Sequence, residues 1–183
     1  MDPRFPIGIL GSILLVAGAA FPSLISKKWL PKAKNFLFAS GNACMFLYAL
    51  LGWLAGGSVL FLILQIYIAT STVLMLLDVP DRYDTPFLTA VGVALVAWSL
   101  TLFEGYATVL FIMGIVLLGI GFASADGTVR RNLALALGSA VIAVFSYLES
   151  DWIFTIVNIL FAFFSGLALK KIHTPPKISP RTA

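Results

Sequence analysis

Charged residues are scarce in this chain of 183 residues: Asp, Glu, Lys and Arg together make up 11% of it, whereas hydrophobic residues make up 60%. Soluble domains carry about 25% charged residues, so the composition excludes an ordinary soluble protein. The chain has a single cysteine, Cys44, and a single histidine, His173. This scarcity excludes a disulfide framework and a thiolate metal site, and we expect neither a metal nor a cofactor.

Long apolar runs dominate the chain instead. About 20 apolar residues cross a hydrocarbon core roughly 30 Å thick. The runs predict seven transmembrane helices, at residues 5–25, 36–54, 58–77, 86–103, 106–123, 132–149 and 152–169. A removable signal peptide is the alternative for the first run, because Ala17-Gly18-Ala19 resembles a cleavage site. β-Barrel strands are about half as long and alternate in polarity, so we predict an all-α integral membrane protein.

The basic residues alternate across the predicted membrane. With seven spans, 11 of the 12 Lys and Arg residues fall on the side opposite the amino terminus, and only Arg4 falls on the same side. They are Lys27, Lys28, Lys32, Lys34, Arg82, Arg130, Arg131, Lys170, Lys171, Lys177 and Arg181. The positive-inside rule therefore predicts a multi-pass protein of the plasma (inner) membrane, with its amino terminus outside and its carboxyl terminus in the cytoplasm. This rule also explains the basic charge, so no nucleic-acid partner is expected.

The first three and the last three spans have similar sequences. Gly18 aligns with Gly119 in the first span of each set, Lys34-Asn35 with Arg131-Asn132 at the start of the second, and Gln65 with Asn158 in the third. Each identity is weak alone, but their common order indicates a duplication. One span separates the two copies, so both have the same orientation in the membrane.

These observations predict seven transmembrane helices arranged as two parallel three-helix bundles joined by a linking helix, a 3+1+3 plan. The predicted units are a first bundle at 1–79, a linking helix at 80–105, a second bundle at 106–169 and a polar cytoplasmic tail at 170–183.

Few polar side chains lie inside the spans, so each is a candidate for function. The candidates for substrate binding are Asn158, Gln65, Asn42 and Ser139, with Tyr48 as a nearby aromatic ring. Amides offer both donors and acceptors, which suits a neutral polar ligand. The alternative for each is an interhelical hydrogen bond that only holds the bundle together.

No Asp, Glu, Lys, Arg or His lies in the central part of any predicted span. Proton- or ion-coupled carriers place ionisable groups there, so passive facilitation is favoured over coupling. No general base and no paired nucleophile is available within the membrane, so we expect that the protein is not an enzyme.

The 3+1+3 plan, the outside amino terminus and the amides of Gln65 and Asn158 resemble the SWEET sugar transporters and the wider group that holds PnuC-type vitamin transporters and PQ-loop proteins. SWEET-like proteins carry a central Asn on the third helix of each unit. A proline in the first helix of each unit is another mark of the group, and the resemblance implies a hinge at Pro22. The second unit has Ala123 in that place, and the Gln of the PQ-loop branch is missing from both units.

The resemblance implies a membrane transporter that moves a small neutral polar solute, sugar-like or vitamin-like, through a central site by alternating access, as a uniporter. A non-transporting scaffold or accessory subunit is the alternative, and an ion channel is a third. The expected partners are the small-molecule substrate and the lipid bilayer, with a homo-oligomer left open.

Overall fold

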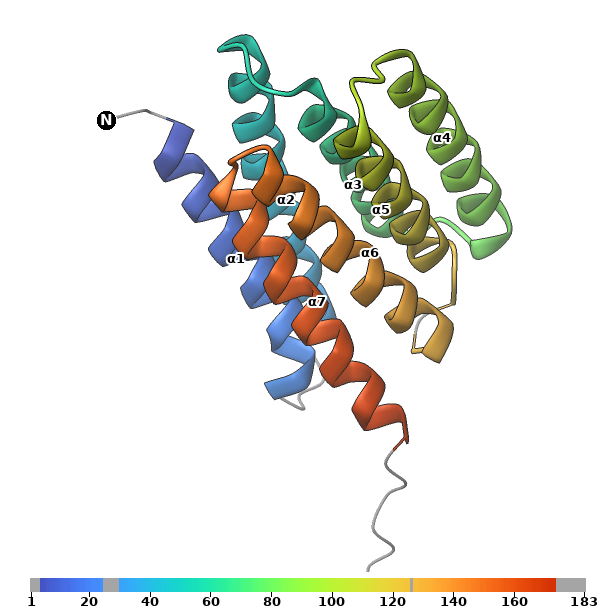
Figure 1. The fold of residues 1–183 in the computed structure, drawn as a ribbon. Helices are drawn as coiled ribbons and strands as arrows, with labels where there is room; N and C mark the ends of the chain where they lie inside the picture. The colour runs from blue at the N-terminus through green and yellow to red at the C-terminus, as the bar shows by residue number, and fades with distance from the viewer. Residues whose placement is uncertain (1–3, 25–29, 126, 174–183) are drawn as a thin grey trace, which may run out of the picture.

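The computed structural model describes residues 4–24, 30–125 and 127–173. This part of the chain is all-helical and has no strand. Its helices are α1 Arg4–Leu24, α2 Leu30–Leu54, α3 Val59–Leu76, α4 Asp81–Thr101, α5 Tyr106–Phe122, α6 Val129–Leu148 and α7 Trp152–His173 (Figure 1). We call the end of the molecule at which α1, α3, α5 and α7 begin the upper end, and the opposite end the lower end.

The helices have the apolar character of a multi-pass membrane protein. Five of them, α2, α3, α4, α6 and α7, are long and apolar enough to cross a bilayer. Shorter apolar stretches are Tyr106–Phe122, which is all of α5, and Arg4–Gly18, which is the part of α1 whose side chains the structure describes. At 1.5 Å per residue, a helix of the length of α5 spans about 26 Å, slightly less than a typical hydrocarbon core. The predicted all-α membrane class is therefore confirmed at this level.

Short turns set the helix boundaries close to the predicted ones. Gly56, Gly105 and Gly127 adopt positive φ angles of 89°, 133° and 75°, a conformation that favours glycine. The largest differences are at two helix starts, because α2 begins at Leu30 rather than at the predicted residue 36, and α4 begins at Asp81 rather than at 86. Helix α4 thereby includes Pro86, where the sequence predicts a polar loop. At the other end, α7 continues to His173, so the first residues of the predicted tail are helical.

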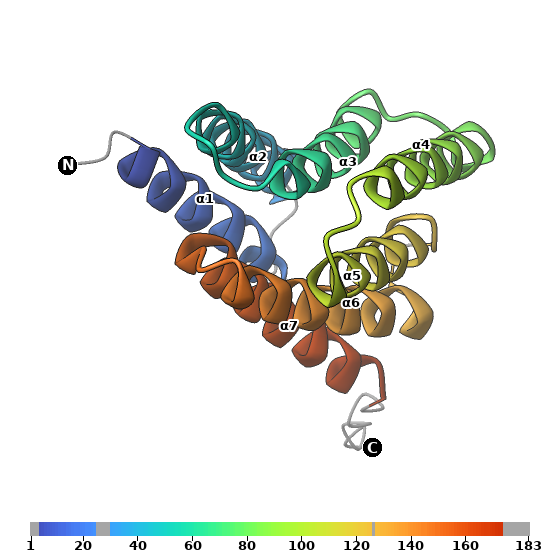
Figure 2. The same ribbon diagram turned by 45° about the horizontal axis from the view of Figure 1, so that its top comes forward.

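Six of the helices form a closed ring. Each helix in the order α1, α2, α3, α5, α6 and α7 packs against the next, and α7 packs against α1 (Figure 2). The predicted repeat pairs α1 with α5 and α3 with α7. Under this pairing, the α1–α7 contact is equivalent to the α3–α5 contact. Among the described residues α1 and α3 are not adjacent, nor are α5 and α7. Each unit is thus a row of three helices within the ring, and separate bundles remain a prediction.

Glycines mediate the close approach of α1 to α2 and of α5 to α6. A Cβ on Gly41 would lie 2.8 Å from the backbone nitrogen of Leu15, and a Cβ on Gly138 would lie 2.8 Å from that of Leu118. Gly11 and Gly114 face Met45 and Ile142, and Gly18 and Gly121 face Phe38 and Leu135. Equivalent residues are 103 positions apart between α1 and α5, and 97 positions apart between α2 and α6, in all of these contacts. The α1–α2 pair and the α5–α6 pair therefore pack in the same way.

The packing revises the sequence alignment of the first helices. Gly18 corresponds to Gly121, two residues beyond the Gly119 with which the sequence aligns it, because Gly121 meets the equivalent neighbour. The second and third helices keep the predicted alignment, which pairs Asn42 with Ser139 and Gln65 with Asn158. All four of these side chains are buried.

Helix α4 lies outside the ring and packs against α3 and α5. Tyr67 of α3 reaches between them, because Gly92 of α4 and Gly119 of α5 leave room for its ring. Tyr67 has no aromatic equivalent in α7, where Leu160 takes its place. The linking helix therefore covers one junction between the two rows, and nothing equivalent covers the α1–α7 junction among the described residues.

Gly41→Ala and Gly138→Ala should each destabilise the protein by about 1–3 kcal/mol, because the added methyl group meets backbone atoms that cannot move aside. Thermal unfolding in detergent measures the effect. Gly166→Ala is the matched control, since a Cβ there has no neighbour within 4 Å. Equal stability of the Gly41 and Gly166 variants would contradict the close packing.

Candidate functional site

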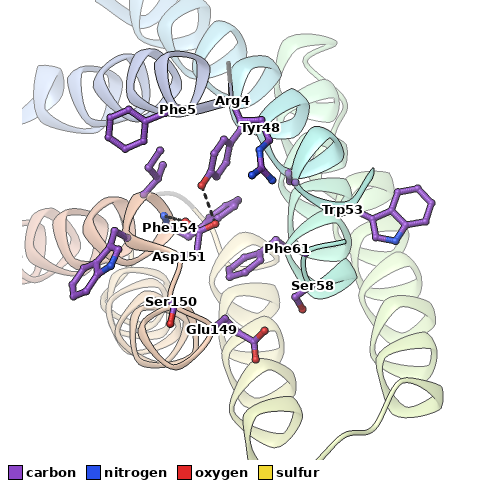
Figure 3. Close-up of a pocket in the computed structure, with 15 residues that line it drawn as sticks. Arg4, Phe5, Tyr48, Trp53, Ser58, Phe61, Glu149, Ser150, Asp151 and Phe154 are labelled. Atoms are coloured by element: carbon purple, nitrogen blue, oxygen red, sulfur yellow. Dashed lines mark hydrogen bonds between the residues drawn. The ribbon is translucent and has the colours of Figure 1, made fainter. Parts of the chain in front are cut away.

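A cavity of about 630 Å³ opens at the upper end, and its lining residues belong to α1, α2, α3 and α7 and to the α2–α3 and α6–α7 turns. We call it the vestibule (Figure 3). Its charged lining residues are Arg4, Glu149 and Asp151, and its aromatic ones are Phe5, Tyr48, Trp53, Phe61, Trp152 and Phe154. Small residues and one aliphatic residue complete it, namely Ala49, Gly52, Gly57, Ser58, Ser150 and Ile153. Its volume is within the usual range of small-molecule sites.

The turn between α6 and α7 places Asp151 at the vestibule. Ser150 has a φ of 60°, and its amide donates to the carbonyl of Tyr147, while the amide of Asp151 donates to that of Ser146. This pair of bonds is a Schellman motif, which ends α6. Asp151 then caps α7, because its Oδ1 accepts from the amide of Phe154 at 3.0 Å. The chain therefore passes from one helix to the next with a fixed carboxylate at the junction.

A hydrogen bond across the vestibule connects the two copies. The hydroxyl of Tyr48 in α2 donates to Oδ2 of Asp151 at 3.0 Å. Asp151 therefore accepts one neutral donor on each carboxylate oxygen, and neither of these donors cancels its charge. Figure 3 shows the bond crossing from α2 to the start of α7.

Stacked aromatic rings form the floor of the vestibule. The rings of Phe61 and Phe154 lie parallel, with centroids 4.6 Å apart and an interplanar angle of 11°. These two residues are equivalent in the two copies, so the third helices meet through matching side chains. Tyr48 packs on Phe154, and Phe145 packs on Phe61. Aromatic pairs of this kind contribute about 0.5–1.5 kcal/mol beyond their area, so the floor holds α3 and α7 together.

Gln65 and Asn158 lie one helical turn below this floor. Asn158 donates from Nδ2 to the carbonyl of Phe154 in its own helix at 2.8 Å. Gln65 is 2% exposed, and its Oε1 is buried without a hydrogen-bond partner among the described residues. No hydrogen bond joins the two amides in the described structure. Both lie about 9 Å below the first residue of their helices, closer to the vestibule than the helix midpoints are.

Asn42 and Ser139 occupy equivalent buried positions on α2 and α6. Asn42 donates from Nδ2 to Oγ1 of Thr72 in α3, and Thr72 in turn donates to the carbonyl of Ile68 at 2.9 Å. The Oδ1 atom of Asn42 has no partner among the described residues. A second buried acceptor therefore lies in the first copy, farther from the vestibule than Gln65.

Of the predicted site residues, only Tyr48 lines the vestibule. Asn158, Gln65, Asn42 and Ser139 lie in the packed interior below it. Pro22 falls within α1, but its side chain is outside what the structure describes. The structure adds Phe61 and Phe154, which the alignment of the two copies already pairs.

The vestibule also brings Arg4, Glu149 and Asp151 together, although they are far apart in the sequence. Partial burial raises the pKa of the Glu149 carboxyl, and the nearby carboxylate of Glu104 raises it further. Neither Glu149 nor Asp151 forms an ion pair with a described residue. No group of three or more His, Cys, Asp or Glu side chains gathers within the described ranges. Among the described residues, the charges that line the vestibule are thus one guanidinium and two carboxylates.

No family model, curated protein or solved structure matches this chain. Its function must therefore be inferred from the vestibule, the aromatic floor and the buried amides.

The folded protein should become more stable as the pH falls, through the Glu149 carboxyl. A raised pKa in the folded state means that folding favours the protonated form. This stabilisation is complete below the unfolded-state value and is lost as the pH rises through the folded-state value. Thermal unfolding of the protein and of Glu149→Gln, from about pH 4 to about pH 7, measures the difference. An identical pH slope in both proteins would contradict the assignment to Glu149.

Proposed function

We propose that this protein is a plasma-membrane transporter that moves a small neutral polar solute by alternating access. Substitution of Gln65 tests this proposal most directly. Two three-helix units, α1–α3 and α5–α7, move relative to each other around a site beneath the aromatic floor. By the positive-inside rule the vestibule faces outward, because the basic residues gather at the lower end. A distant relation to the SWEET, PnuC and PQ-loop group is part of the proposal and rests on this plan.

The unpartnered oxygen of Gln65 carries the proposal. A buried acceptor without a partner costs about 1–3 kcal/mol of stability, and this cost is larger in a bilayer, where no water can donate to it. A solute that brings a hydroxyl or an N–H to this oxygen recovers that free energy. Asn42 offers a second acceptor of the same kind. Both acceptors are uncharged, so they suit a neutral donor-bearing solute.

The arrangement of the third helices supports movement between the two units. Phe61 and Phe154 close the vestibule floor directly above Gln65 and Asn158, and they come from different units. Parting of these rings opens a path from the vestibule to the amides, and their stacking closes it. The equivalent packing of the two units allows the reverse motion at the lower end, as in other transporters with repeated units. No Asp, Glu, Lys, Arg or His lies at this depth in α3 or α7, so facilitated diffusion without a coupling ion is favoured.

A non-transporting scaffold or accessory subunit is the second candidate. Its supporting observation is that Gln65, Asn42, Ser139 and Asn158 line no described cavity, and that Asn158 bonds within its own helix. Under this alternative the amides serve packing only, and purified protein moves no solute.

Gln65→Met should raise thermal stability and lower uptake about tenfold, because methionine keeps the shape of glutamine and removes the unpartnered oxygen. Uptake of sugars, nucleosides and zwitterions by proteoliposomes first identifies a transported solute, and unfolding in detergent gives the stability. Ile159→Met, on an exposed position of α7, is the matched control. Unchanged uptake by Gln65→Met would remove Gln65 from the site, and no uptake of any solute would favour the scaffold.

A further inference from the structure

We propose that the vestibule binds a small zwitterion of the amino-acid class, with the solute carboxylate at Arg4 and its ammonium group at Asp151 and Glu149. This inference names the solute class for the proposed transport. It rests on the proposed function only for the transport step, because binding in the vestibule stands by itself. An amino-acid zwitterion has no net charge, which agrees with the uncharged amides below.

The lining charges of the vestibule come from its two sides. Arg4 belongs to α1, and its Nη1 lies 3.9 Å from the position of a Cβ on Gly52 of α2. Glu149 and Asp151 belong to the α6–α7 turn. Figure 3 shows the Arg4 side chain beside Tyr48, Asp151 bonded to that tyrosine, and Glu149 on the other side of the cavity. A ligand whose negative end lies at Arg4 and whose positive end lies between Asp151 and Glu149 therefore finds an opposite charge at each end.

The two carboxylates have the chemistry of an ammonium site. Asp151 already accepts from Tyr48 and from the amide of Phe154, and each of its oxygens keeps a second lone-pair position. Both donors are neutral, and no described residue pairs with Asp151 or Glu149 as a cation. Partial burial and Glu104 raise the pKa of Glu149, so a cationic group nearby stabilises its ionised form.

The remaining lining suits the body of an amino acid. Tyr48, Phe61 and Phe154 give the inner wall an apolar surface, and Ser58 adds a hydroxyl. A volume of about 630 Å³ admits both small and aromatic amino acids. A sugar has no charged ends and would form an ion pair with neither Arg4 nor the two carboxylates. The vestibule therefore favours a zwitterion over a polyol.

Binding to detergent-purified full-length protein tests the inference, measured by thermal shift and by the tryptophan fluorescence of Trp53 and Trp152. The probes are L-alanine, L-leucine and L-phenylalanine, with glucose for comparison. L-Leucine methyl ester removes the negative charge, and N-acetyl-L-leucine removes the positive one. We expect at least one free amino acid to bind, and the two blocked forms to bind about tenfold more weakly, since each loses a charge-assisted hydrogen bond.

Two variants test which lining residue binds the carboxylate end of the solute and which binds its ammonium end. Arg4→Gln should weaken the free amino acid about tenfold and leave the methyl ester unchanged, whereas Asp151→Asn, which keeps a helix-capping side chain, should weaken both. Arg130→Gln is the matched control, because Arg130 is exposed at the lower end and does not line the vestibule. Comparison of the blocked forms uses the unmodified protein, so it remains informative if a variant fails to fold.

Three results would overturn the inference: no amino acid binds, glucose binds instead, or the methyl ester binds as tightly as the free amino acid. Proteoliposome uptake separates this inference from the proposed function. An amino acid that binds but is not transported leaves the vestibule site intact and contradicts transport of that solute. Transport of a sugar without amino-acid binding would contradict the vestibule site and support the proposed transport function.

Discussion

The close approach of helix backbones at Gly41 and Gly138 is the contact on which the rest of the structure depends. In a lipid environment the hydrophobic effect does not press helices together, so association relies on van der Waals packing at small residues. Gly41 lies against the backbone of α1 and Gly138 against that of α5, and both contacts have the same geometry. These two rigid pairs fix the positions of the third helices, which pack on the second helices of their units.

The two helix pairs bring α3 and α7 to the same region of the ring. Phe61 and Phe154 then stack between them, and the turn that caps α7 places Asp151 within reach of Tyr48. The aromatic floor and this hydrogen bond link the two copies at the upper end, in addition to the packing of α1 against α7. The stacked rings of Phe61 and Phe154 give the junction an apolar floor, and the bond between Tyr48 and Asp151 gives it a polar upper part.

This separation accounts for the distribution of polar groups. Charged side chains line the open vestibule, whereas Gln65, Asn158, Asn42 and Ser139, buried below the floor, are uncharged amides and a hydroxyl. A charge at the lower level would cost several kcal/mol, whereas an amide costs far less and still offers hydrogen bonds. A zwitterion bound in the vestibule and amides beneath it give the proposed transport an order of contacts, from charge recognition to hydrogen bonding.

The sequence by itself determined the number of helices, most of their boundaries and the buried amides of Asn42, Gln65 and Asn158, because apolar length and glycine turns are local signals. The start of α4 was predicted too late, since Pro86 is tolerated within the helix. The alignment of the first helices was two residues off, since apolar residues there match in several registers. Only the tertiary structure decided which side chains share a cavity. Lipid and protein interior are equally apolar, so a membrane helix carries little pattern to show which face is inward. Arg4, Asp151 and the stacked pair of Phe61 and Phe154 therefore meet through helix packing that no local pattern reports.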